Sequence, residues 1–189
     1  MPVQMNSPFV IGRIWLCVIL AITFASFNSA RADESGATCQ SPGWDMSREI
    51  ATFRGTAASL SASNTANDLR TIDVGSLYAL KLRPQADVQF LQPPEKASRA
   101  QTPLAGLVRF TVTSSGKYRI TVDAALWIDV VSPTGILPSS AFNGWHACSL
   151  FRKSVEYTFQ AGQMFVLQFS GAATELVKMA IEPKEETSK

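Results

Sequence analysis

"GKYRITVDAALWIDVVSPTG", residues 116–135, is the stretch from which the fold of this chain can be predicted. Within it, residues 117–123 alternate between apolar and polar side chains, and a period of two is typical of a strand with one buried face. Residues 126–131 are apolar on both faces except for Asp129, which predicts a strand inside a sheet. Residues 132–135, "SPTG", predict a turn, because proline suits its second position.

Segments with the same alternation lie on both sides of this stretch. They are residues 76–83, 108–113, 155–159, 164–169 and 175–181. The short "SSG" (114–116) between two strands predicts a hairpin turn. About eight short strands separated by turns predict an all-β fold, an antiparallel β-sandwich or jelly roll. The sandwich is expected to span residues 72–183, followed by a solvated tail over residues 184–189.

The segment before the strands, residues 33–71, is rich in Ala, Ser, Thr and Asn and is expected to be a poorly regular cover for the sandwich. Within it, residues 55–68 show no sustained apolar period and predict a loop. Residues 45–53 predict one or two helical turns, with Asp45 as the cap and three apolar side chains on one face. These side chains are Met46, Ile50 and Phe53.

Residues 1–32 are predicted to be a secretory signal peptide. Residues 14–27 form an apolar run, and Ala30 and Ala32 occupy the small-residue positions of a cleavage site. The alternative is an uncleaved membrane anchor, but a spanning helix needs about 20 apolar residues and this run is shorter. After cleavage the chain is expected to be free of the membrane, in the periplasm or outside the cell.

The charge of the mature chain gives no electrostatic case for binding nucleic acid. The whole sequence has 17 basic and 15 acidic residues. The predicted signal peptide contains Arg13 and Arg31 and no acidic residue, so its removal leaves a chain close to neutral. Proteins that bind nucleic acid usually carry a basic patch, and no such cluster is present. No nucleic-acid partner is therefore expected.

Two cysteines, Cys39 and Cys148, remain after the predicted cleavage, because Cys17 lies within the apolar run. Exported proteins meet an oxidising compartment, and an even number of cysteines there favours a bridge. We therefore predict a disulfide between Cys39 and Cys148.

The histidine near Cys148 leaves alternatives open. The sequence contains one histidine, His146, within "GWHACSLFRKSVEY" (144–157). With reduced cysteines it could complete a metal site, and beside a thiol or a serine it could serve as a catalytic base. However, a metal site needs several ligands, a Cys–His pair would have no nearby orienting group except Asn143, and no Gly-x-Ser-x-Gly elbow occurs. A disulfide beside a surface histidine is the favoured interpretation.

Trp127 and Asp129 are two residues apart and therefore share one face of their predicted strand. With Trp145, Trp44 or Phe142 they could form a platform on which a sugar ring stacks beside a polar partner. The alternative is that Trp127 packs in the core and that Asp129 pairs with a cation, because a buried carboxylate is costly unless it is paired.

The cation expected beside Asp129 is Arg152, because the planar guanidinium suits a carboxylate better than the ammonium of a lysine. Residues 94–99, "PEKASR", are expected to be an ordinary connection after a strand. The side chains that we expect to be available for contact with a ligand are Trp127, Asp129, Trp145, His146, Arg152 and Lys153.

Residues 116–135 and "RKSVEYTFQAGQMFVLQFSG" (152–171) resemble the pre-peptidase C-terminal type of β-sandwich. In that family a Gly-x-Tyr strand, a strand that ends at a turn, and an "AG" hairpin before an apolar strand follow in this order. The resemblance covers residues 105–182 and implies the same sandwich fold. Domains of this type usually accompany secreted enzymes and often hold calcium at acidic sites, but this sequence has no acidic cluster of that kind.

The pattern of "WIDVV", Cys148 and "RK" (152–153) is also similar to a group of small exported proteins of Gram-negative bacteria. Some members of that group are labelled homogentisate 1,2-dioxygenase. Such an enzyme holds ferrous iron with two histidines and a carboxylate. Since the sequence has one histidine, a single chain cannot supply these ligands. We therefore reject this activity and expect neither a metal nor another cofactor.

These patterns favour an exported, non-catalytic binding or envelope-accessory module that recognises a saccharide or a protein surface. The alternatives are a small periplasmic enzyme, either a hydrolase or metal-dependent, that uses His146, and a purely structural envelope protein. Buried tryptophans would favour the structural alternative, whereas an open aromatic groove would favour binding. The sequence leaves the oligomeric state and the identity of the ligand open.

Cleavage of the predicted signal peptide can be tested directly. We expect the exported protein to begin at Asp33, because Ala30 and Ala32 precede that position after the apolar run. N-terminal sequencing of protein recovered from the periplasm or the medium measures this. Exported protein that begins at Met1 or Met5 would contradict the prediction.

Overall fold

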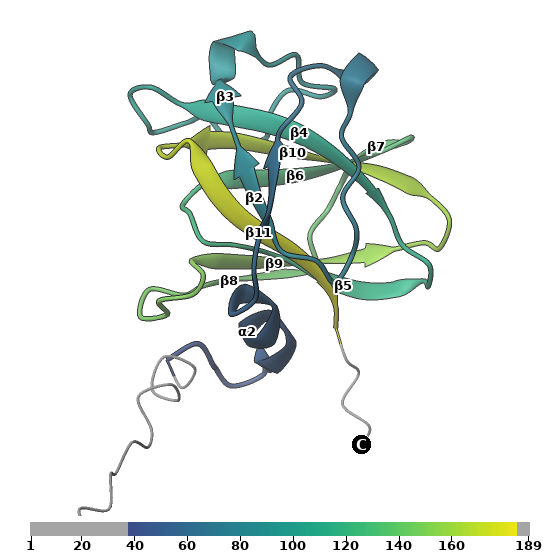
Figure 1. Ribbon diagram of the computed structural model, residues 1–189. Helices are drawn as coiled ribbons and strands as arrows, with labels where there is room; N and C mark the ends of the chain where they lie inside the picture. Colours follow the sequence, from purple (N-terminus) through teal and green to yellow (C-terminus); the bar gives the residue numbers. More distant parts are fainter. Residues whose placement is uncertain (1–37, 185–189) are drawn as a thin grey trace, which may run out of the picture.

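The computed structural model describes residues 38–184, which form two β-sheets packed face to face (Figure 1). This confirms the predicted all-β sandwich. The predicted signal peptide, residues 33–37 and residues 185–189 lie outside the described residues. Within residues 38–184, no helix is long and apolar enough to span a membrane.

The larger sheet has six strands and the smaller sheet has five. In spatial order the six-stranded sheet contains β1 (Ala58–Ser61), β2 (Tyr78–Lys81), β11 (Leu176–Pro183), β5 (Gly116–Val122), β9 (Lys153–Phe159) and β8 (Ala141–Gly144). The five-stranded sheet contains β3 (Arg83–Pro84), β4 (Leu104–Thr111), β10 (Met164–Ala172), β6 (Trp127–Ser132) and β7 (Gly135–Leu137). The pairs are antiparallel except for β1 and β2, which run parallel.

The main hydrophobic core lies between the two sheets. At its centre the ring of Phe159 on β9 contacts Phe110 on β4 and Phe165 on β10, with centroids 5.1 and 4.6 Å apart. All three side chains are almost completely buried. Because apolar residues alternate along each strand, pairing the strands brings one apolar face of each sheet against the other.

The predicted hairpin at residues 114–116 is wrong. Strand β4 before it pairs with β3 and β10, whereas β5 after it pairs with β9 and β11, so the chain crosses here from one sheet to the other. Short polar turns serve both kinds of connection, and local sequence does not distinguish them. The predicted turn at residues 132–135 is confirmed, since Ser132 pairs with Gly135 in the hairpin between β6 and β7.

The segment over residues 55–68 contains more regular structure than expected. Strand β1 lies within it, at the edge of the six-stranded sheet, and a short 3-10 helix, η1 (Ala66–Asp68), follows. A second one, η2 (Gln85–Asp87), comes after β3. The four residues of β1 are small or half-exposed, so they carry no apolar period from which a strand could be predicted.

Helix α2 (Ser47–Phe53) covers the outer face of the six-stranded sheet, below β8 and β9 in Figure 1. Its predicted apolar face is confirmed, because Met46, Ile50 and Phe53 are buried. Asp45 lies just before the cap position and accepts hydrogen bonds from the backbone N–H and the hydroxyl of Ser47, at 3.0 and 2.6 Å. The predicted disulfide between Cys39 and Cys148 is also confirmed. It ties the chain before α2 to the connection between β8 and β9.

A buried cluster of charges holds α2 to the sheet. Arg119 on β5, one of the polar positions in the alternating residues 117–123, is 4% exposed. Its guanidinium lies 2.9 Å from Glu156 on β9 and 3.5 Å from Glu49 on α2. Lys184 also contacts Glu156, at 3.0 Å, so this residue of the expected solvated tail is half-buried and paired.

Burial alone would raise the pKa of Glu156, but hydrogen bonds from Lys184 and Arg119 outweigh it and lower the pKa below its ordinary 4.5. Burial raises the pKa of Glu49, on the other side of the guanidinium. A carboxyl group whose pKa is lowered in the folded state stabilises the fold above its unfolded pKa. That contribution is lost as the pH falls through the folded pKa.

We therefore expect Lys184→Met to lower the free energy of unfolding by about 1–2 kcal/mol at pH 7, between the values typical of exposed and buried pairs. The loss should shrink as the pH falls below the ordinary pKa of Glu156, 4.5. Urea unfolding between pH 7 and pH 3 measures it. Lys81→Met is the matched control, because the Lys81–Glu175 pair is 60% and 58% exposed. A loss for Lys184→Met that does not change with pH would contradict the prediction.

Candidate functional site

The outer face of the five-stranded sheet is covered by residues 85–103, the connection between β3 and β4. Val88, Phe90 and Leu91 from this segment pack against apolar side chains of the sheet. Beside this apolar patch, the register of β6 and β10 places Asp129 opposite Gln168 and Trp127 opposite Ser170. The candidate site lies where the covering segment passes over these residues.

The side chain of Gln168 fixes the covering segment to the sheet. Its Oε1 accepts hydrogen bonds from the backbone N–H groups of Leu91 and Gln92, at 2.7 and 3.2 Å. Its Nε2 donates to the carbonyl of Gln92 at 3.0 Å. Because Gln168 is fully buried, leaving these groups unpaired would be costly, so the path of the segment is determined here.

Asp129 orients the indole of Trp127. One carboxylate oxygen accepts a hydrogen bond from Trp127 Nε1 at 2.6 Å, and the other accepts from the backbone N–H of Glu95 at 3.3 Å. Asp129 is 2% exposed, and this burial raises the pKa of its carboxyl group. The carboxylate thus serves as a fixed acceptor for the Nε1–H of the indole, and it also anchors the covering segment.

Trp127 is half-buried, and two lysines lie against its ring. Lys153 at the start of β9 has its Nζ 4.6 Å from the ring centroid, and Lys96 in the covering segment has its Nζ 5.8 Å away. Cations at these distances are attracted to the face of an indole. Lys153 also donates to the carbonyl of Leu126 at 3.3 Å, and its burial lowers the pKa of its ammonium group.

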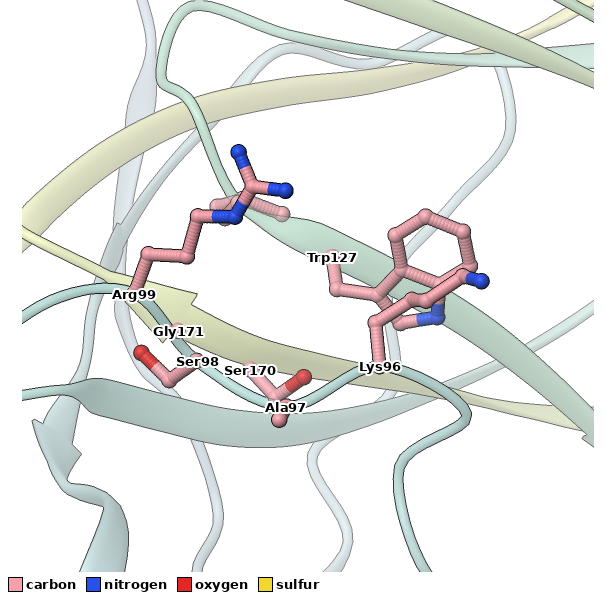
Figure 2. A pocket seen from close by; sticks show the side chains of 8 residues that line it. Lys96, Ala97, Ser98, Arg99, Trp127, Ser170 and Gly171 are labelled. Carbon is pink, nitrogen blue, oxygen red and sulfur yellow. The ribbon is translucent and has the colours of Figure 1, made fainter.

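A pocket of about 430 Å³ lies beside Trp127, and we call it the Trp127 pocket. Figure 2 shows the side chains that line it. The lining residues are Lys96, Ala97, Ser98, Arg99, Leu126, Trp127, Ser170 and Gly171. Ser170 is 2% exposed, and among the described residues its hydroxyl has no hydrogen-bond partner. A buried hydroxyl normally has one, but this oxygen is itself closed off from solvent, so the polar groups that a ligand in the pocket can reach are the exposed side chains of Lys96 and Arg99.

A smaller cleft of about 130 Å³, which we call the aromatic cleft, also borders Trp127. It is lined by Glu95, Trp127, Ile128, Leu137, Ser139, Phe142, Lys153, Val155 and Tyr157. Phe142 on the edge strand β8 is 75% exposed at this cleft. Tyr157 donates its hydroxyl hydrogen to the carbonyl of Ile128 at 3.1 Å, and burial raises the pKa of its phenol. Trp127 therefore lines two adjoining hollows.

The structure brings together Trp127, Asp129 and Lys153, but the predicted ion pair between Asp129 and Arg152 is wrong. Arg152 is exposed, and its guanidinium donates to the carbonyl of His146 at 3.4 Å. Strands β6 and β9 belong to different sheets, so they are not paired neighbours, and Arg152, just before β9, does not reach Asp129. Lys153, one residue further on, is the cation that reaches the site.

Trp145 does not belong to the surface formed by Trp127. It is 4% exposed and packs in a second core cluster, against Phe151 and Trp44 with centroids 5.7 and 6.0 Å away. Its Nε1 donates to the hydroxyl of Ser154 at 3.1 Å. The expected contact of Trp145 with a ligand is therefore wrong, and Phe142 is the second aromatic side chain near Trp127.

His146 is exposed in the connection between β8 and β9, and it lines neither the Trp127 pocket nor the aromatic cleft. Cys148 is bonded to Cys39, so it offers no thiolate to a metal or a substrate. Among residues 38–184, no group of three His, Cys, Asp or Glu side chains is placed to hold a metal ion. The alternatives that paired His146 with a reactive Cys148 are thus wrong.

Four residues near the site were not predicted from the sequence: Lys96, Arg99, Gln168 and Ser170. The first two lie in residues 94–99, which were expected to be an ordinary connection. The other two are polar positions within the apolar strand β10, and each lies opposite a residue that was considered, Asp129 or Trp127. Polar residues two apart in a strand that is otherwise buried were the signal that could have revealed this face.

Comparisons with known proteins add little to this geometry. No family model matches the chain, and no curated protein matches it. One solved structure with a similar part is a β-glucosidase from Kluyveromyces marxianus in complex with glucose, with a TM-score of 0.32 and 10% identity. The similar part covers 51% of this chain and 12% of the β-glucosidase chain. This likeness is too weak to support a function, and the resemblance to pre-peptidase C-terminal domains stays a prediction.

The two neighbouring cations should differ in their effect on stability. We expect Lys153→Ala to lower the free energy of unfolding by about 1–3 kcal/mol, because the ammonium loses a partly buried hydrogen bond and its contact with Trp127. Arg152→Ala should change it by less than about 0.5 kcal/mol, as is usual for an exposed residue. Urea unfolding with the disulfide intact measures both. A larger loss for Arg152→Ala would contradict this assignment.

Proposed function

We propose that this protein is a non-catalytic binding module and that it recognises a saccharide at the Trp127 pocket. The observation that carries the proposal is the half-buried indole of Trp127, held in place by Asp129 on the wall of a pocket that the polar side chains of Lys96 and Arg99 also line. A sugar ring has an apolar face that can stack on an indole, and hydroxyl groups that need polar partners at its edge. The pocket offers both.

The rigidity of the site supports binding. The hydrogen bond from Trp127 Nε1 to Asp129 fixes the rotation of the indole, and Gln168 fixes the segment that carries Lys96 and Arg99. A site whose side chains are already ordered loses less conformational entropy when a ligand binds. The pocket volume of about 430 Å³ also lies within the range of small-molecule sites.

The proposal includes export to the periplasm or beyond the cell. The disulfide supports it, since such bonds form and persist in oxidising compartments.

A second candidate function is recognition of a protein surface at the aromatic cleft. The exposed ring of Phe142 beside Trp127 favours it, because exposed aromatic side chains are enriched where proteins meet.

An array of neutral and acidic oligosaccharides, followed by titration calorimetry with the glycan that binds best, tests saccharide binding. We expect Trp127→Ala to weaken that binding at least tenfold, because the stacking surface is lost, and Trp127→Phe to retain more of the affinity. Met164→Ala is the control, since Met164 is 50% exposed at the opposite end of β10 from Ser170.

Thermal unfolding of each variant shows whether the fold is retained. Equal affinity of the Trp127→Ala variant, or no binding of any glycan by the natural protein, would overturn the proposal.

A further inference from the structure

We infer that the saccharide taken by the Trp127 pocket is acidic and that its carboxylate is held by Arg99 and Lys96. This inference rests on the proposed function and names the class of sugar. It follows from the positive charges on the pocket wall and from the absence, among the described residues, of a partner for Arg99.

The Trp127 pocket is cationic. Lys96 and Arg99 line it, and none of its lining residues is acidic. The carboxylate of Asp129 lies behind the indole and is closed off, because one oxygen accepts from Trp127 Nε1 and the other from the N–H of Glu95. The side chain of Glu95 lines the aromatic cleft instead. An anion in the pocket therefore meets two positive side chains and no exposed negative one.

Arg99 has no partner of its own among the described residues, in hydrogen bonds or ion pairs. Several other cations of the chain are paired: Arg70 with Asp68, Lys81 with Glu175, Arg119 with Glu49 and Glu156, and Lys184 with Glu156. The guanidinium is a planar fork that binds a carboxylate through two parallel hydrogen bonds. Its full hydrogen-bonding capacity is available to a ligand.

Figure 2 shows how these groups surround one space. Arg99 and Trp127 lie on opposite sides of the pocket, and the side chain of Lys96 extends along the indole. A sugar ring stacked on Trp127 would thus present a substituent toward Arg99. Ser170 and Gly171 of β10 provide the floor below this space.

Gly171 allows the covering segment to come this close to β10. Its φ is 72°, a conformation that favours glycine, and a Cβ at this position would lie 3.1 Å from the hydroxyl oxygen of Ser98. Ser98 stands between Lys96 and Arg99 in the sequence, so this contact places both cations over the pocket. The cationic wall is thus a product of tight packing between the segment and the strand.

Matched pairs of oligosaccharides test the inference: trimers of galacturonate, glucuronate and mannuronate, each with its methyl ester. The ester keeps the sugar ring but removes the negative charge. We expect the natural protein to bind at least one acid at least tenfold more tightly than its ester in titration calorimetry. The difference should fall as salt is added, because screening weakens exposed charges.

Arg99→Gln and Lys96→Gln should each remove most of the preference for the acid, because they lower the affinity for the acid far more than the affinity for the ester. Lys117→Gln, an exposed lysine on β5 in the other sheet, is the control and should have no effect.

Two results separate this inference from the proposed function. Equal affinity for acid and ester, or a preference for a sulfated or phosphorylated trimer over the carboxylated one, would overturn the inference alone. Failure of every sugar to bind would overturn both.

Discussion

The constraint on which the site depends is that buried polar groups must be hydrogen-bonded. Asp129 and Gln168 face outward from the five-stranded sheet, yet both are buried, because residues 85–103 cover that face. Each side chain obtains its partners from the backbone of this segment, at Glu95 and at Leu91 and Gln92. An unpaired buried acceptor or amide costs about 1–3 kcal/mol, so sheet and segment fix each other's position. The orientation of Trp127 and the place of Lys96 and Arg99 follow from this mutual anchoring.

The other sheet is covered in a different way. Its outer face meets α2, and the contact depends on Arg119, which lies between Glu49 of the helix and Glu156 of the sheet. The disulfide between Cys39 and Cys148 joins the chain before the helix to the connection between β8 and β9. Each outer face of the sandwich is therefore covered in part, one by α2 and the other by residues 85–103. Trp127, at the start of β6 where the covering segment leaves a hollow, presents a ring that is only half-buried, and this is why the proposed binding activity is placed there.

Part of the site could be predicted from sequence, because its residues share one strand. Trp127 and Asp129 are two positions apart, so their common face follows from the geometry of a strand alone. Lys96, Arg99 and Ser170 could not be assigned in this way. The register of β6 with β10 brings Ser170 beside Trp127, whereas Lys96 and Arg99 reach the pocket because hydrogen bonds to Gln168 and Asp129 hold the covering segment on the sheet. Whether Arg152 or Lys153 reaches the site also depended on which sheet β9 joins. The alternation of side chains in residues 153–159 predicts a strand but does not show which sheet that strand joins.

By itself, the sequence determined the β class, the places of most strands and the pairing of the two cysteines. Each of these rests on a local period or on a count: side chains alternate within a strand, and the two cysteines that follow the predicted signal peptide allow one bridge. The tertiary structure alone decided that residues 114–116 cross between sheets, that residues 58–61 form an edge strand, and that Trp145 is buried while Trp127 is only half-buried. The physical reason is that these outcomes depend on contacts between segments far apart in the chain. The free energy of such a contact comes from burial and hydrogen bonding between two segments. The sequence of one segment does not identify the other segment that it will contact.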